Sequence, residues 1–338
     1  METKKRWQEI DALYAIGIVL VLIGHSHSSD WTKFDHTVLK SAIYFIYTFH
    51  MALFFFISGF LFRNSDSFER LGLGRWIRDK ALRLLTPYLL LSYLALFPKY
   101  WVEHHGFTGL TRKTVLDTVL VPRLGVWGHF WFLPVLFLAY VLFGWWRTLC
   151  RTENKRWMIL LALILSLVFY FLPIRTGVFG LADLRSMLVF FAVGIAVNDV
   201  MTENKYDGLK GNALLISLIV SLVITIAAVL LTDLARKNSI VELLVALGML
   251  FSCGCYASVL PKGKIVKWLS SHNFTIYIFS WLFQSVMMAV CDHFGFNWIV
   301  TFFLMFLTGL AGPAIVILIY DKCPFLHHQF FRLVCGIR

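Results

Sequence analysis

Two histidines stand inside apolar runs near the start of the chain, and they are the first residues whose type and position suggest chemistry. His25 ends the run IDALYAIGIVLVLIGH, and His50 lies in the next run, TFHMALFFFISGFLF, together with Ser58. An ionisable side chain inside a membrane span costs free energy, so it usually faces the protein interior and marks a function. Imidazole suits a general base because it takes up and returns a proton near neutral pH. The pair therefore predicts acid–base chemistry, and the alternative is that each is a neutral ring that ties two helices together.

The first apolar run has a polar stripe along one face of the expected helix. Asp11, Tyr14, Ile18, Val21 and His25 follow one another at spacings of three and four, which places them on the same helical face. Since this face carries polar groups, we expect it to pack against other helices and not against lipid. His25 comes about 22 Å from the start of the run at 1.5 Å per residue. That places it toward the outer leaflet, with His50 nearer the midplane.

A second cluster that could carry chemistry is the basic run RWIRDKALR, which stands just before a span that begins at Pro87. Its cations are Arg75, Arg78, Lys80 and Arg83. Guanidinium and ammonium groups both bind phosphate, and the alternative, which charge alone favours, is anchoring to anionic lipid headgroups. Residues 63–86 as a whole alternate arginines with apolar residues, which predicts an amphipathic helix lying in the membrane interface.

These residues need a membrane scaffold to position them. The 338 residues are 59% hydrophobic and 15% charged, with a mean hydropathy of +0.74, which is typical of a polytopic membrane protein. At about 20 apolar residues per span, the sequence predicts an all-α integral membrane bundle of ten transmembrane helices, of which the third and sixth are short. The expected spans are Ile10–His27, Leu39–Phe62, Pro87–Trp101, His129–Trp146, Trp157–Leu172, Arg185–Val197, Asn212–Thr232, Ile240–Leu260, Phe274–Cys291 and Trp298–Tyr320.

The distribution of charge predicts the orientation of this bundle. With the N-terminus inside, 21 of the 31 Lys and Arg residues fall on the cytoplasmic side and 10 on the outer side, as in multi-pass proteins of the plasma (inner) membrane with both termini cytoplasmic. The net charge of +12 is explained in this way and predicts membrane lipids, not nucleic acid, as partners. The outer loop 102–128 could cover a site that opens outward. We expect residues 1–338 to form a single transmembrane domain, with no cleavable signal and no appended soluble domain, and the six cysteines have no spacing typical of a metal site.

Five blocks in order give the chain a family likeness. They are IDALYAIGIVLVLIGH, FHMALFFFISGFLF, RDKALRLLTPYL, HFWFLPVLFLAY and NFTIYIFSW. From Trp7 to about Trp281 the chain resembles the acyltransferase-3 family of ten-span membrane O-acyltransferases, and within it the fucose 4-O-acetylase-like branch.

The resemblance implies an enzyme that transfers an acyl group, usually acetyl from cytoplasmic acetyl-CoA, to a hydroxyl of a cell-surface or lipid-linked glycan. It implies that His25 is the catalytic histidine, acting as general base. The second-span histidine of the family corresponds to His50, and its SGF turn to Ser58, Gly59 and Phe60. The oxyanion of the tetrahedral intermediate needs hydrogen-bond donors, for which His50, Ser58 and Tyr14 are the candidates.

The donor site implied by the resemblance lies on the basic run. The family's patch for the phosphates of CoA falls on Lys80 and Arg83, and we expect Arg78 to join them. No metal is implied.

The chain departs from the family pattern at two positions. Members commonly carry Arg or Lys eleven positions before the catalytic histidine, where this chain has Tyr14, and many have a histidine where Ser280 stands. These departures indicate a divergent enzyme.

Two other functional classes compete with the enzyme. A transporter or exporter of a glycan or a small acid could use intramembrane histidines as a proton relay, but the related halves of such proteins are not visible here. A purely structural subunit explains neither histidine.

Overall fold

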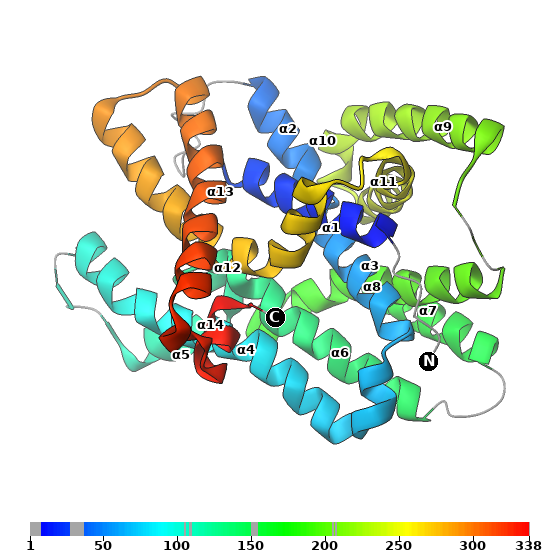
Figure 1. Ribbon diagram of the computed structural model, residues 1–338, viewed down its shortest axis with the longest axis horizontal. Helices are drawn as coiled ribbons and strands as arrows, with labels where there is room; N and C mark the ends of the chain where they lie inside the picture. The colour runs from blue at the N-terminus through cyan, green and yellow to red at the C-terminus, as the bar shows by residue number, and fades with distance from the viewer. Residues whose placement is uncertain are drawn as a thin grey trace. The chain divides into compact units, whose positions relative to one another are not determined.

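The computed structural model describes residues 8–27, 37–104, 106–107, 110–149, 155–204, 206 and 208–337. Within these residues all regular structure is helical, and no strand occurs, so the predicted all-α class is confirmed. Eight described helices are long and apolar enough to cross a membrane. The chain folds into two compact units, one of Met1–Ile57 with Asn204–Phe325 and the other of Ser58–Glu203 with Leu326–Arg338 (Figure 1).

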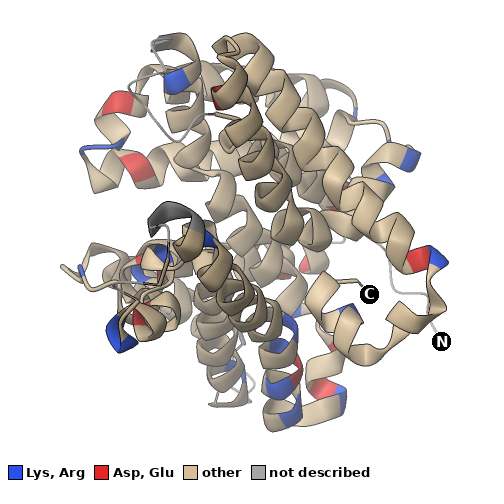
Figure 2. Cartoon of the chain, turned by 90° about the vertical axis from the view of Figure 1, so that its left-hand side faces the viewer, with Lys and Arg blue, Asp and Glu red and all other residues tan. Residues whose placement is uncertain are grey.

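Each of the ten expected spans coincides with a helix or with a consecutive helix pair. In order they are α1 Gln8–Gly24, α2 Thr37–Tyr47 with α3 His50–Arg63, α4 Asp66–His104, α6 Phe132–Leu149, α7 Lys155–Phe171, α8 Leu181–Glu203, α9 Gly211–Leu230, α11 Ser239–Val259, α12 Lys264–Phe294 and α13 Trp298–Lys322. The shorter elements between and after them are α5 Arg112–Leu120, α10 Thr232–Ala235, α14 Gln329–Cys335 and four 3₁₀ turns, η1 Pro122–Leu124, η2 Gly128–Trp131, η3 Val178–Gly180 and η4 Pro324–His327. Charged residues lie mainly near helix ends, with α4 as the exception (Figure 2).

Three details of the expected spans are wrong. The third span is not a separate short helix, because α4 runs through the basic run and Pro87 to His104 and breaks only at Gly72, where φ is 73°. The sixth, expected at Arg185–Val197, is part of the 23-residue α8. The motif of residues 58–60 is not a turn, since it lies inside α3.

In the first unit, α1 packs against α12, α11 and α13, and α12 also packs along α13. The core side chains that these helices bury completely are Ile18, Leu22, Ile276, Ile278 and Met305. Small residues permit the close approach of membrane helices. At Gly312 of α13, for example, an added Cβ would lie 2.1 Å from the Phe283 ring of α12.

In the second unit, α7 packs on α8, and α4 and α8 both pack on α6. Aromatic rings fill the interior: Phe143 stacks on Phe191 with centroids 4.8 Å apart, and the buried Trp76 of α4 meets Tyr140 of α6 edge-on at 5.6 Å. The loop 102–128 contains α5, and Arg123 beyond it donates to Asp183 of α8 at 2.7 Å. That ion pair fixes the end of the loop to the first turn of α8.

Candidate active site

His25 lies directly after the last residue of α1, at the end of the polar stripe. Its ring meets the edge of Trp281 from α12 with centroids 5.3 Å apart, and Tyr47 from α2 lies tilted against it at 6.2 Å. The ring is therefore not inside the helix, as the span Ile10–His27 implied, but just beyond its C-terminal end.

Tyr47 connects the two histidines of the sequence prediction. Its ring lies 6.2 Å from that of His25 and 5.3 Å from that of His50, measured between centroids. Its hydroxyl donates to the Gly24 carbonyl at 2.6 Å and lies 3.4 Å from Nε2 of His27. The structure thus brings His25 and His50 close to one tyrosine. Sequence reasoning missed Tyr47 because nothing in SAIYFIYTFH distinguishes it from other aromatic residues.

The protonation pattern of His50 follows from its hydrogen bond. The side chain is buried, and its Nδ1 lies 2.9 Å from the carbonyl of Ile46. A carbonyl can only accept a hydrogen bond, so Nδ1 carries the proton of this bond. This bond joins His50 to the last turn of α2, four residues earlier in the same expected span.

Tyr14 lies three helical turns from His25, a distance of about 16 Å along α1 at 1.5 Å per residue. Its ring packs 6.3 Å from that of Phe54 of α3, and Asp11, one turn earlier, accepts a hydrogen bond from Ser270 of α12 at 2.7 Å. As predicted, the polar stripe faces other helices. Tyr14 and His25 occupy different levels of that stripe.

Ser58 is buried in α3, eight residues after His50 and about 12 Å from it along the helix axis. The next residue, Gly59, makes the tightest helix contact of the second unit. A Cβ there would lie 2.0 Å from the backbone oxygen of Phe191 in α8. The glycine of this motif is therefore required by packing.

The basic run does not present all its cations in one direction. Lys80 and Arg83 are half-buried on the same side of α4 as the buried Trp76, whereas Arg78 is exposed on another side. The Lys80 ammonium lies 4.3 Å from the centroid of the Tyr140 ring and 5.1 Å from that of Trp76. Cation–π contacts of this kind fix a lysine that would otherwise be mobile.

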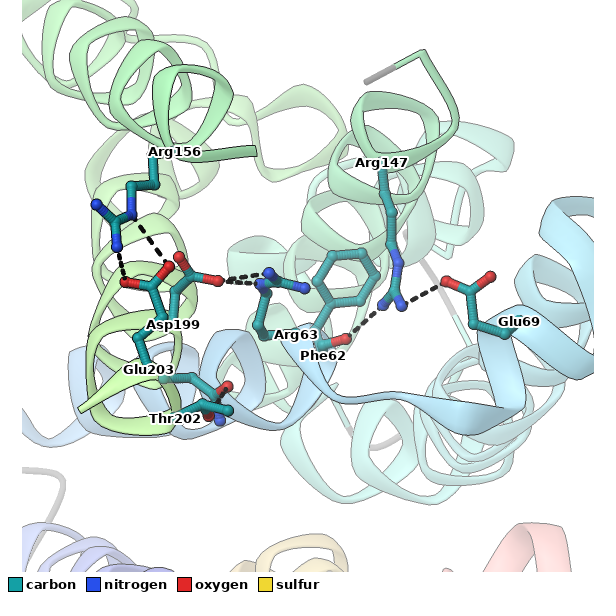
Figure 3. A network of polar contacts seen from close by, with 9 residues as sticks. Phe62, Arg63, Glu69, Arg147, Arg156, Asp199, Thr202 and Glu203 are labelled. Atoms are coloured by element: carbon teal, nitrogen blue, oxygen red, sulfur yellow. Dashed lines mark hydrogen bonds and ion pairs between the residues drawn. The ribbon is translucent and has the colours of Figure 1, made fainter. Parts of the chain in front are cut away.

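Three further arginines at helix ends of the second unit form a polar network (Figure 3). Arg63 donates to Asp199, Arg147 donates to Glu69 at 2.7 Å and to the Phe62 carbonyl at 2.8 Å, and Arg156 pairs with Glu203 at 2.7 Å. A cavity of about 350 Å³ adjoins the network, lined by Phe62, Arg63, Phe68, Glu69, Phe143, Trp146, Arg147, Met158, Ile159, Ala162, Ala192 and Ile195. From the sequence alone, these arginines contribute only to the count of basic residues on the cytoplasmic side. Their acidic partners lie far away along the chain, so the ion pairs could not be predicted.

The part of the chain that the structure describes contains no group of three or more His, Cys, Asp or Glu side chains placed to hold a metal ion. The side chains in this part that could take part in a reaction are instead histidines, hydroxyls and amides at helix ends and helix contacts.

Comparison with known proteins gives the site its context. The chain is 30% identical over 141 residues to nodulation protein NolL of Mesorhizobium japonicum, an alignment that covers 41% of this chain and 36% of NolL. It thus spans about a third of the length of that relative, and no solved structure matches. The family described as "Acyltransferase domain" matches residues 7–318. This match covers nearly the whole chain, including the end of α1 with His25, and the chain therefore belongs to this acyltransferase family.

Proposed function

We propose that this membrane acyltransferase moves an acyl group, acetyl in the simplest case, from cytoplasmic acyl-CoA to a hydroxyl of a cell-surface or lipid-linked glycan, with His25 as general base. Family membership supports acyl transfer to a hydroxyl, and the apolar helices support a multi-pass protein. The observation that carries the proposal is the place of His25, a half-buried imidazole just beyond a helix C-terminus with the rings of Trp281 and Tyr47 near it.

One histidine is enough for both proton transfers of the proposed reaction. An unprotonated nitrogen of His25 takes the proton of the acceptor hydroxyl while the hydroxyl oxygen attacks the thioester carbonyl. The carbon–oxygen bond forms, and the negative charge moves to the carbonyl oxygen. When this tetrahedral intermediate collapses, the carbon–sulfur bond breaks, and the imidazolium returns its proton to the sulfur of CoA.

The oxyanion donors are part of the same proposal. His50, Ser58 and Tyr14 remain the candidates, and their positions along the helices separate their roles. His50 shares Tyr47 with His25, whereas Tyr14 lies three turns away along α1. Tyr14 is therefore better placed to contact another part of a long donor than the carbonyl that His25 serves.

The donor enters from the cytoplasm in this proposal, and Arg78, Lys80 and Arg83 hold the phosphates of CoA. The charge bias of the loops supports this orientation, with the termini and the basic run inside. Single cysteines at the exposed positions 75 and 113 test it, because a membrane-impermeant maleimide applied to intact cells should label position 113 and leave position 75 unlabelled. The reverse pattern would overturn the orientation and with it the side of donor entry.

The test of the reaction itself is His25→Ala. Loss of a general base typically lowers a rate by about 10²–10⁴, whereas loss of a helix tie costs about 1–2 kcal/mol of stability at most. We expect the variant to insert and accumulate like the parent while mass spectrometry finds its surface glycans without the acyl group. The control is His272→Ala, which removes a histidine of α12 whose Nδ1 lies 2.9 Å from the carbonyl of Trp268. Near-parental acylation by His25→Ala would contradict the mechanism.

A further inference from the structure

The end of α1 is held from two sides by side chains of other helices. The last four carbonyls of a helix have no partner within it, and in α1 these belong to residues 21–24. The Val21 carbonyl accepts from the His25 amide at 3.1 Å, and the Ile23 carbonyl accepts from the Ser26 amide at 3.1 Å. The Leu22 carbonyl accepts from the Ser26 hydroxyl at 2.6 Å and from the Gln284 side chain at 3.0 Å. The Gly24 carbonyl accepts from the Tyr47 hydroxyl at 2.6 Å. Every one of the four is satisfied, and two of the donors come from elsewhere in the chain.

Gln284 of α12 is one of these outside donors. The side chain is completely buried, and its Nε2 donates both to the Leu22 carbonyl and, at 3.1 Å, to the Ser26 hydroxyl. Space for it is provided by Gly309 of α13, where an added Cβ would lie 2.8 Å from the Gln284 side chain. Its Oε1 is buried without a hydrogen-bond partner among the described residues. Leaving an amide oxygen buried and unpaired costs free energy, and the hydrogen bonds that this side chain makes among the described residues are those of its NH₂ group.

Tyr47 of α2 is the other outside donor. Its hydroxyl is bonded to the carbonyl of Gly24, the residue directly before His25, and its ring lies against both histidine rings. Gln284 thus bonds to Leu22 and Ser26, which lie before and after His25 in the chain. Tyr47 bonds to Gly24, directly before His25. The backbone that carries the imidazole is fixed on both sides.

We propose that Tyr47 and Gln284 are the positioning residues of His25, a clamp that holds the base in line with the acceptor hydroxyl. The inference rests on the proposed function, in which His25 takes the proton. A general base must come within about 2.6–3.2 Å of the atom whose proton it removes, and a displacement of 1 Å costs about 10²-fold in rate. His25 lies just beyond the end of α1: its amide still bonds to the Val21 carbonyl at 3.1 Å, but no further helical turn follows to constrain it. The clamp supplies that constraint.

The test uses Tyr47→Phe and Gln284→Met, which keep the ring and the side-chain length but remove the donors to the α1 carbonyls. The protein is purified in lipid nanodiscs, with radiolabelled acetyl-CoA as donor and envelopes of cells that lack the gene as acceptor. We expect kcat to fall about 10–100-fold in each variant, with the apparent KM for acetyl-CoA within about twofold of the parent. Tyr256→Phe is the matched control, since it removes a tyrosine hydroxyl bonded to Thr225 at 2.9 Å between α9 and α11. It should match the two variants in thermal stability and the parent in kcat.

The outcomes separate this inference from the function on which it rests. If His25→Ala is inactive while Tyr47→Phe and Gln284→Met turn over at the rate of Tyr256→Phe, the clamp is refuted and the base stands. If the two variants lose activity only in proportion to lost folded protein, the contacts are structural and the inference fails. If His25→Ala is as active as the parent, the proposed mechanism fails first, and the positioning role fails with it.

Discussion

The rings of His25 and Trp281 meet edge-on, with their centroids 5.3 Å apart and their planes at 63°. The two residues close the first and the last of the sequence blocks that carry the family resemblance, IDALYAIGIVLVLIGH and NFTIYIFSW. The contact explains why blocks so distant along the chain belong to one pattern. The end of α1 and the middle of α12 form one side of the candidate site, and each block supplies a ring to it.

The first prediction concerns Tyr14, which stands in α1 at the position where the family commonly has Arg or Lys. Tyr14→Phe keeps the ring that packs on Phe54 and removes only the hydroxyl. If that hydroxyl contacts the donor, a hydrogen bond to a charged group worth about 1.5–3 kcal/mol is lost, and transfer should fall about tenfold or more. Protein accumulation, measured by immunoblot, should not change. Full activity in the Phe variant would show that only the bulk of the ring matters.

The helices could be predicted from the sequence, and most of the contacts around the site could not. Apolar runs of span length and the stripe that ends at His25 are local patterns, and they identified the ten segments and the face of α1 that packs inward. Tyr47 and Gln284 were missed because their importance comes from a bond to a carbonyl on another helix. The length of α4 was underestimated because the apolar span was counted from Pro87, whereas the helix begins at Asp66 and continues through the basic run and Pro87.

Lys80 provides the prediction for the donor side. The rings of Tyr140 and Trp76 hold its ammonium in place, and in the proposed donor site this ammonium binds a phosphate of CoA. Lys80→Gln combined with Arg83→Gln should raise the apparent KM for acetyl-CoA about tenfold or more, the loss expected for charge-assisted bonds of about 1.5–3 kcal/mol, with little change in kcat. Arg75→Gln, an exposed cation on the same helix, is the matched control and should leave KM unchanged. An unchanged KM in the double variant would mean that the two cations only anchor lipid.

The network in Figure 3 predicts unequal effects of two acidic residues on one helix. Asp199 is 11% exposed and pairs with Arg63, which is 28% exposed, whereas Glu203 and its partner Arg156 are 43% and 77% exposed. Removing one member of a buried pair leaves a charge without compensation, which is strongly destabilising, and exposed pairs contribute little. Asp199→Asn should therefore lower the thermal unfolding temperature clearly, and Glu203→Gln should not. Equal shifts in the two variants would show that burial does not decide the strength of these pairs.

Gly59 provides the sharpest packing prediction. An alanine Cβ at this position would lie 2.0 Å from the backbone oxygen of Phe191 and 2.8 Å from its carbonyl carbon. Because the obstacle is backbone inside a helix, α3 and α8 would have to move apart, and the cost should exceed the roughly 1–3 kcal/mol typical of an overpacked core. Gly59→Ala should therefore fail to accumulate as folded protein, as judged by size-exclusion chromatography of detergent extracts. Gly254→Ala is the matched control in α11, where a Cβ meets nothing within 4 Å, and it should be neutral or stabilising by about 0.5–1 kcal/mol. If Gly59→Ala folds as well as Gly254→Ala, the close contact between α3 and α8 is not present in the membrane.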